Sequence, residues 1–71
     1  MKIEYDKEAD AMYISLKDEY VDKTEEVDNG VSLDFDKGGN LIGIEILHAT
    51  KKYSKKDLFD LTTRNLVLES V

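Results

Sequence analysis

The chain has 71 residues, no cysteine, no proline and a formal net charge of −6. This length predicts a single domain over residues 1–71, and the lack of cysteine excludes disulfides and thiolate metal sites. A chain this short has a small core and commonly needs a partner subunit, so we expect a homodimer. No segment is long and apolar enough to cross a bilayer, and the acidic N-terminus is unlike a signal peptide. We therefore expect a cytoplasmic protein without membrane contact.

The charge is unevenly distributed along the chain. Residues 1–47 hold thirteen acids and five lysines, a balance of −8, whereas residues 48–71 carry a balance of +2. An acidic body repels a phosphate backbone, so nucleic acid is not an expected partner.

The first sixteen residues have the alternation of a β-hairpin. Ile3, Met12 and Ile14 each lie between polar or small neighbours. A four-residue loop at 6–9 would pair Ile3 with Met12. All three apolar side chains then share one face of the hairpin, as a half-buried sheet requires.

Residues 21–27 alternate weakly and carry many charges, which is typical of an edge strand. A turn at 28–30 follows, because Asp, Asn and Gly tolerate positive φ. Residues 31–46 then form a second hairpin around a loop at 37–40. The predicted pairs are Phe35 with Ile42, Leu33 with Ile44 and Val31 with Ile46. The opposite face would carry Ser32, Asp34, Asp36, Gly43 and Glu45.

The C-terminal part, residues 52–71, predicts a helix and a tail. Ser54 has the features of an N-cap, with Asp57 three residues later in the manner of a capping box. The helix is expected from residue 55 to about residue 62, with Leu58 and Leu61 on one stripe. That stripe would pack on the central hairpin or on the first hairpin, and the pattern does not choose between them. Residues 66–71 favour a sixth strand over a continued helix.

The central loop imitates a calcium site. Asp34, Asp36, Gly39 and Glu45 fall at positions 1, 3, 6 and 12 of an EF-hand loop. Gly38 stands at position 5, however, where an oxygen ligand is needed, and the flanking residues alternate as strands instead of helices. We therefore expect an acidic hairpin face and assign no metal-binding residue.

The remaining constellations do not define an active site. Asp6, Glu8 and Asp10 cluster at a turn, where nothing predicts the burial that would tune a carboxyl group for catalysis. His48 is the sole histidine, expected at a strand end, and one histidine cannot make a triad. We expect no enzyme, no cofactor and no catalytic or cofactor-binding residue.

Four lysines gather before the predicted helix: Lys51, Lys52, Lys55 and Lys56. Such runs are usually solvated. They also lie where the helix macrodipole disfavours cations. A contact patch for an acidic partner is therefore the alternative interpretation.

Two phrases resemble a known family. They are the run from Tyr5 to Ile14, YDKEADAMYI, and the run from Gly30 to Ile46, GVSLDFDKGGNLIGIEI. Together they resemble the small prokaryotic family called domain of unknown function 2283, over roughly residues 1–51. The resemblance implies a protein without established activity, and family members that accompany small toxin-like proteins suggest an antitoxin-like role. The family usually has an acid where this chain has Gly38, which further weakens the calcium interpretation.

The sequence thus predicts an α+β domain: a five-stranded antiparallel β-meander over residues 1–51, covered on one face by a C-terminal helix. The leading functional hypothesis is a non-catalytic protein-binding module, antitoxin-like or self-associating. The alternatives are a weak divalent-ion-binding module that uses Asp34, Asp36 and Glu45, and an enzyme site assembled at a dimer interface.

Overall fold

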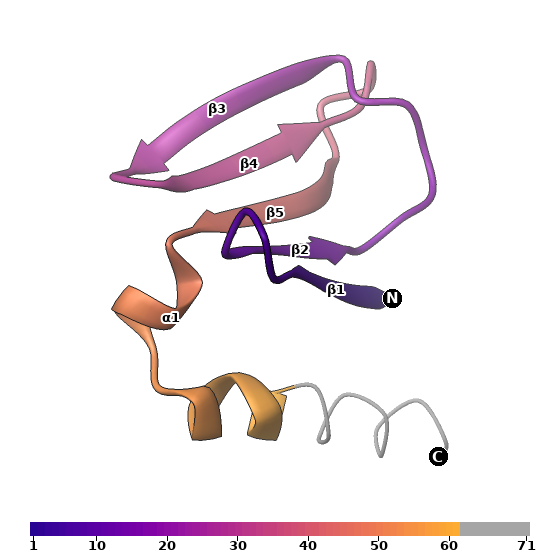
Figure 1. Cartoon of the computed structure of the whole chain (residues 1–71). Helices are drawn as coiled ribbons and strands as arrows, with labels where there is room; N and C mark the ends of the chain where they lie inside the picture. Colours follow the sequence, from indigo (N-terminus) through magenta and orange to yellow (C-terminus); the bar gives the residue numbers. More distant parts are fainter. Residues whose placement is uncertain (62–71) are drawn as a thin grey trace.

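A computed structural model describes residues 1–61. A five-stranded antiparallel sheet is followed by two short helical segments (Figure 1), which confirms the α+β class. The strands are β1 (Lys2–Asp6), β2 (Ala11–Ser15), β3 (Lys23–Asp28), β4 (Val31–Phe35) and β5 (Leu41–Leu47). The helix α1 covers Ala49–Lys52, and residues 55–61 are also helical.

The strand order is β1-β2-β5-β4-β3, which corrects the predicted meander. The chain leaves β2, the second strand of the sheet, passes around the side of the sheet and returns as β3 at the far edge (Figure 1). A meander would have placed charged β3 in the centre. The observed order instead gives that place to apolar β5, whereas every residue of β3 is exposed. The edge position predicted for this strand is confirmed, because charged strands are tolerated only where one side faces water.

The first hairpin differs from its predicted register by two residues. Ile3 lies opposite Ile14, and Tyr5 lies opposite Met12, whereas we expected Ile3 opposite Met12. A shift of two residues preserves the faces. The predicted sharing of one face by Ile3, Met12 and Ile14 is therefore confirmed.

The turn explains this shift. The Asp6 carboxylate accepts hydrogen bonds from the backbone N–H groups of Glu8 and Ala9, at 3.0 and 3.3 Å, so Asp6 ends the strand and starts the turn. Asp10 closes the loop at φ 51°, in the left-handed region that Asp adopts more readily than most residues. The four-residue loop is thus 7–10, one position later than predicted.

The second hairpin keeps two of its three predicted pairs. Leu33 faces Ile44 and Val31 faces Ile46, but Phe35 faces Leu41. The predicted partner, Ile42, becomes the extra residue of a β-bulge. Its carbonyl oxygen accepts the Leu16 N–H at 2.8 Å and the Lys17 N–H at 3.3 Å, so the bulge anchors the start of the crossover.

The C-terminal segments are tied to the sheet at Asp10. Its carbonyl oxygen accepts the Ala49 N–H at 2.9 Å, and its carboxylate accepts the Thr50 N–H and hydroxyl. His48 ends the β5 segment exposed, at φ 54°. The turn α1, between β5 and the predicted helix, was not predicted; four residues are too few to show a helical period.

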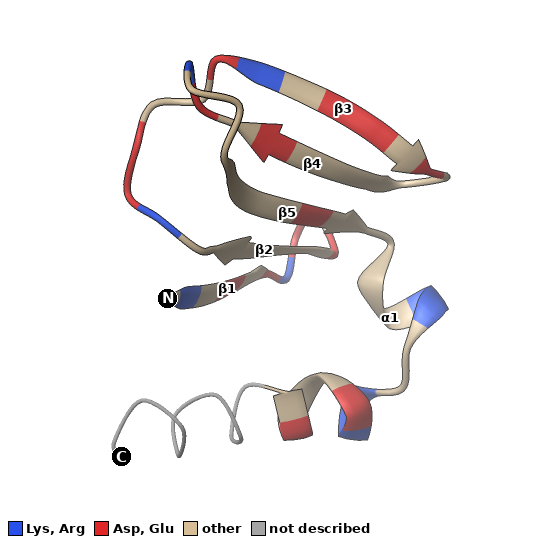
Figure 2. Ribbon diagram, turned by 180° about the vertical axis from the view of Figure 1, so that it is seen from behind, with Lys and Arg blue, Asp and Glu red and all other residues tan. Residues whose placement is uncertain are grey.

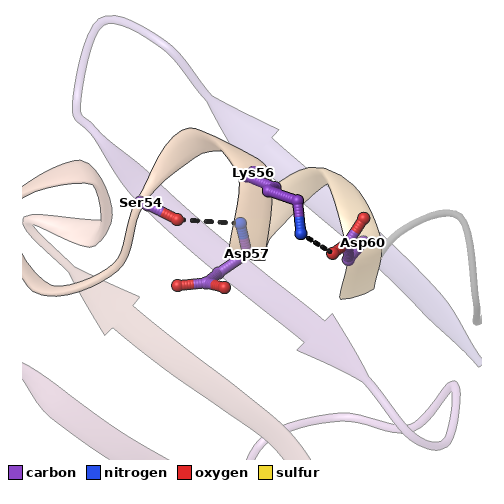
Figure 3. A network of polar contacts seen from close by, with 4 residues as sticks. All are labelled: Ser54, Lys56, Asp57 and Asp60. Atoms are coloured by element: carbon purple, nitrogen blue, oxygen red, sulfur yellow. Dashed lines mark hydrogen bonds and ion pairs between the residues drawn. The ribbon is translucent and has the colours of Figure 1, made fainter.

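The predicted cap of the second helix is confirmed. The Asp57 N–H donates to Ser54 Oγ at 3.0 Å, and Lys56 pairs with Asp60 at 3.5 Å (Figure 3). Leu58 is half-buried and lines a hollow together with Met12, so this helix faces the first hairpin.

Leu61 remains 41% exposed, so only one of the two residues predicted to pack is covered. The expected sixth strand at 66–71 lies outside the described residues.

Candidate functional site

The sheet has two unlike faces, and the register assigns each strand residue to one of them. The apolar face carries Ile3, Met12, Ile14, Val31, Leu33, Phe35, Ile44 and Ile46. The polar face carries Glu4, Tyr13, Thr24, Ser32, Asp34, Gly43 and Glu45.

A hydrogen-bond network crosses four strands on the polar face. Tyr13 on β2 donates its hydroxyl to Asp34 Oδ2 on β4 at 2.6 Å, and Thr24 on β3 donates to Asp34 Oδ1 at 2.6 Å. Asp34 is 9% exposed. Each of its carboxylate oxygens therefore has a hydroxyl donor in place of water, which satisfies a buried charge.

Gly43 makes this network sterically feasible. The glycine lies on β5, between the strands that carry Tyr13 and Asp34. A Cβ at this position would lie 1.9 Å from the Tyr13 hydroxyl oxygen and 2.5 Å from Cζ of the same ring. The tyrosine side chain thus lies directly over the glycine, and no side chain fits between them.

The network is poorly suited to catalysis. Burial and the hydrogen bond to Asp34 raise the pKa of Tyr13 to about 12. A phenol with that pKa stays protonated at neutral pH, so it has no basic form available to accept a proton. The buried carboxylate is already held by two donors. The arrangement is that of a structural tie that joins β2, β4 and edge strand β3.

The predicted acidic triad is not brought together as a cation site. Asp34 is occupied by Tyr13 and Thr24. Asp36 Oδ1 accepts the N–H groups of Gly38 and Asn40, both at 2.9 Å, and these bonds lower the pKa of Asp36. Within residues 1–61, no three His, Cys, Asp or Glu side chains are grouped so as to hold a metal ion.

The other acidic cluster also has a local structural role. Asp10 accepts the Tyr5 hydroxyl at 2.7 Å as well as the bonds from Thr50, and the Tyr5 bond is the main cause that lowers the Asp10 pKa. Asp6 is engaged in the turn described above. Both carboxylates therefore act within the fold.

Some of the four lysines predicted as a contact patch interact with acceptors within the chain. Lys52 Nζ donates to the Asn29 carbonyl oxygen at 2.5 Å, and Lys56 pairs with Asp60. Lys51 and Lys55 are exposed. In Figure 2 part of α1 is blue, whereas red stretches lie on β3, β4 and β5.

The side chains of the apolar face are only partly covered by the rest of the chain. Seven of its eight apolar side chains are only half-buried: Ile3, Ile14, Val31, Leu33, Phe35, Ile44 and Ile46. Met12, Ile42 and Ala49 are the fully buried apolar residues within 1–61. These seven side chains are less covered than Met12, although none of them is among the exposed large apolar side chains of residues 1–61.

Sequence reasoning missed the polar network. It placed Asp34 and Gly43 on one face but gave no role to Tyr13 or Thr24. A glycine inside an otherwise apolar strand was the available indication, because it marks a bulge or a close approach. It did not reveal which side chain approached.

The comparisons with known proteins give a family. Residues 2–49 match the family described as "Protein of unknown function (DUF2283)". The chain therefore belongs to that family, which confirms the resemblance drawn from the sequence.

A relative is an uncharacterized protein of Methanocaldococcus jannaschii, 35% identical over 71 residues. The match covers all of this chain and 60% of the length of that relative. No solved structure matches the chain significantly. No helix in the described part of the chain is long and apolar enough to span a membrane.

Proposed function

We propose that this chain is a non-catalytic protein-binding module of the antitoxin type, whose apolar sheet face receives a cationic, amphipathic segment of another protein. The observation that carries the proposal is the apolar face, with seven half-buried large side chains in a chain whose fully buried apolar residues, within 1–61, are three.

Burial of this face by a partner supplies a favourable free energy. Removing apolar surface from water gives about 25 cal/mol per Å², and a standard interface buries about 800 Å² on each partner. The apolar side chains that a partner would cover come from β1, β2, β4 and β5. Because the side chains are ordered on a sheet, the conformational cost of binding is modest.

Charge indicates the chemistry of the partner. The net charge of the chain is −6, and residues 1–47 carry −8. At the β3 border of the apolar face, Glu25 lies opposite Leu33. A basic partner is therefore attracted over a distance and fits this border, whereas an acidic partner is repelled.

The absence of catalysis is part of the proposal. The most enclosed carboxylate, Asp34, holds two hydroxyl groups, and the phenol beside it is protonated at neutral pH. The antitoxin component rests on the family resemblance and on the charge of the chain.

A matched pair of substitutions on β4 tests the binding face. Leu33 on the apolar face lies opposite Glu25, and Ser32 on the polar face lies opposite Glu26. Leu33→Lys and Ser32→Lys thus introduce the same charge, each facing a glutamate. Tagged wild-type, L33K and S32K proteins are used to capture proteins from a lysate of the native host, with quantification by mass spectrometry. Circular dichroism checks that both variants fold.

We expect a basic protein that wild type and S32K retain and that L33K loses. Expression of that protein alone should inhibit growth, and co-expression of this chain should restore it. A captured set that L33K and wild type share in full would refute the apolar face as the binding site. A captured protein without toxicity would refute the antitoxin component alone.

The divalent-ion alternative is not favoured. The carboxylates of Asp34 and Asp36 already accept hydrogen bonds within the fold. A cation that bound them would have to displace those hydrogen bonds first.

A further inference from the structure

We propose that β1 is a second interaction surface, distinct from the apolar face, and that it pairs antiparallel with β1 of a second copy of this chain, with Ile3 opposite Ile3. The two sheets then join into one sheet of ten strands.

The first argument is the position of β1 in the sheet. The strand order gives β1 one neighbour, β2, so its other edge is unpaired within the sheet. An open edge presents backbone N–H and C=O groups that another strand can pair with. The sheet has two such edges, β1 and β3.

The two edges differ in how they oppose pairing. β3 carries Glu25, Glu26 and Asp28 and contains a register shift between Glu26 and Asp28. Clustered charges of one sign and a bulge are features that prevent strand addition. β1 has no bulge, because its pairing with β2 is regular over five residues. Its charges are one lysine and two acids, at Lys2, Glu4 and Asp6.

The second argument is the self-complementary charge of β1. Lys2 and Glu4 lie on the polar face, with Lys2 Nζ 3.8 Å from Glu4 Oε2 within the chain. In an antiparallel pair centred on Ile3, Lys2 of each copy faces Glu4 of the other. Opposite charges directly across a strand pair are favourable, and like charges are not.

Other registers are less favourable. A pair centred on Glu4 would place Lys2 opposite Asp6 but would also place two Glu4 carboxylates face to face. A shift of one residue would put apolar side chains on the polar face. The register centred on Ile3 satisfies both the charges and the faces.

This pairing has a defined symmetry. The two-fold axis passes perpendicular to the sheet, between the two Ile3 residues, so both apolar faces point in the same direction. Each copy then keeps its own apolar face available, and the assembly displays two of them side by side.

The test is a charge exchange on β1, with any affinity tag placed at the C-terminus. Mass in solution is measured by sedimentation equilibrium for wild type, Lys2→Glu, Glu4→Lys and the double variant K2E/E4K. Each single change replaces two attractive pairs by two repulsive ones, and the double change restores attraction. Urea unfolding of each variant controls for monomer stability.

We expect a wild-type dimer. Each single variant should dissociate about tenfold or more readily, because two cross-strand pairs change from attraction to repulsion. The double variant should return to within about threefold of wild type by the same reasoning.

Three results would overturn the proposal. They are a wild-type monomer at the highest soluble concentration, a dimer that neither single change weakens, and rescue of Lys2→Glu by Asp6→Lys instead of Glu4→Lys. The L33K variant separates this proposal from the preceding one. It should leave the dimer intact, and K2E should leave capture of the basic protein intact.

Discussion

Substitution of Gly43 by alanine tests whether the cross-sheet network depends on the absence of a side chain at this position. The added Cβ would lie 1.9 Å from the Tyr13 hydroxyl oxygen. An ordinary contact begins at 3.4 Å, so the hydroxyl must move away and its 2.6 Å bond to Asp34 is lost. We therefore expect G43A to destabilise the protein.

The magnitude follows from two opposing effects. A hydrogen bond to a charged group contributes about 1.5–3 kcal/mol, and the displaced ring also loses its packing over the glycine. Alanine recovers about 0.5–1 kcal/mol relative to glycine within a strand. The net loss in the free energy of unfolding should be about 2 kcal/mol.

A double-mutant cycle isolates the clash. The Tyr13→Thr background removes the ring but keeps a good strand former. There, G43A should be neutral or stabilising by up to about 1 kcal/mol, so the coupling energy should be about 2–3 kcal/mol. Urea denaturation followed by circular dichroism measures all four proteins. Equal destabilisation by G43A in both backgrounds would refute the account of the glycine.

Three further predictions concern stability. Because the pKa of Tyr13 is raised from 10.0 to about 12, stability should be fully present below pH 10 and should fall between pH 10 and 12 in urea titrations; Tyr13→Phe should reduce this step, to which the raised pKa of Tyr5 also contributes, and an unchanged step would contradict the assignment. The pKa of Asp36 is lowered by hydrogen bonds, chiefly from the Asn40 N–H, so stability should fall as pH drops below 3.8, and less steeply in Asp36→Asn. Met12 is 1% exposed, so Met12→Ala should cost about 2–5 kcal/mol; thermal unfolding measures the loss, and a negligible change would place the core elsewhere.

The sequence predicted what short-range patterns determine. The pairs Leu33–Ile44 and Val31–Ile46 were foreseen because alternation and turn residues agree within one hairpin. The capping of residues 55–61 by Ser54 was foreseen for the same reason, since the cap and the helix are adjacent in the chain.

The neighbour of β2 could not be read from the sequence. Local patterns favour β3, the next strand in the chain, as the next strand in space. Whether β2 pairs with β3 or with β5 depends on which of these two strands is stabilised more by a neighbour on each side. The charges of β3 indicated an edge strand. A sheet has two edges, however, and the charges did not show at which edge β3 lies.

The site was predictable in part. The apolar and polar faces follow from alternation, so Leu33 and Asp34 were placed on opposite faces correctly. The bond between Tyr13 and Asp34 spans an intervening strand. A one-dimensional pattern contains no such relation, and the glycine beneath the ring was the only local trace of it.

The order of the strands has a consequence for biosynthesis. Among residues 1–61, β5 is the last strand to leave the ribosome, yet it is the middle strand of the sheet. A nascent chain can form the hairpins β1–β2 and β3–β4, but the inner edges of both remain open until Leu47 emerges and β5 inserts between them. Such non-local closure slows folding, and open inner edges are prone to aggregation. Translation that stalls before this strand therefore leaves two incomplete halves with open inner edges.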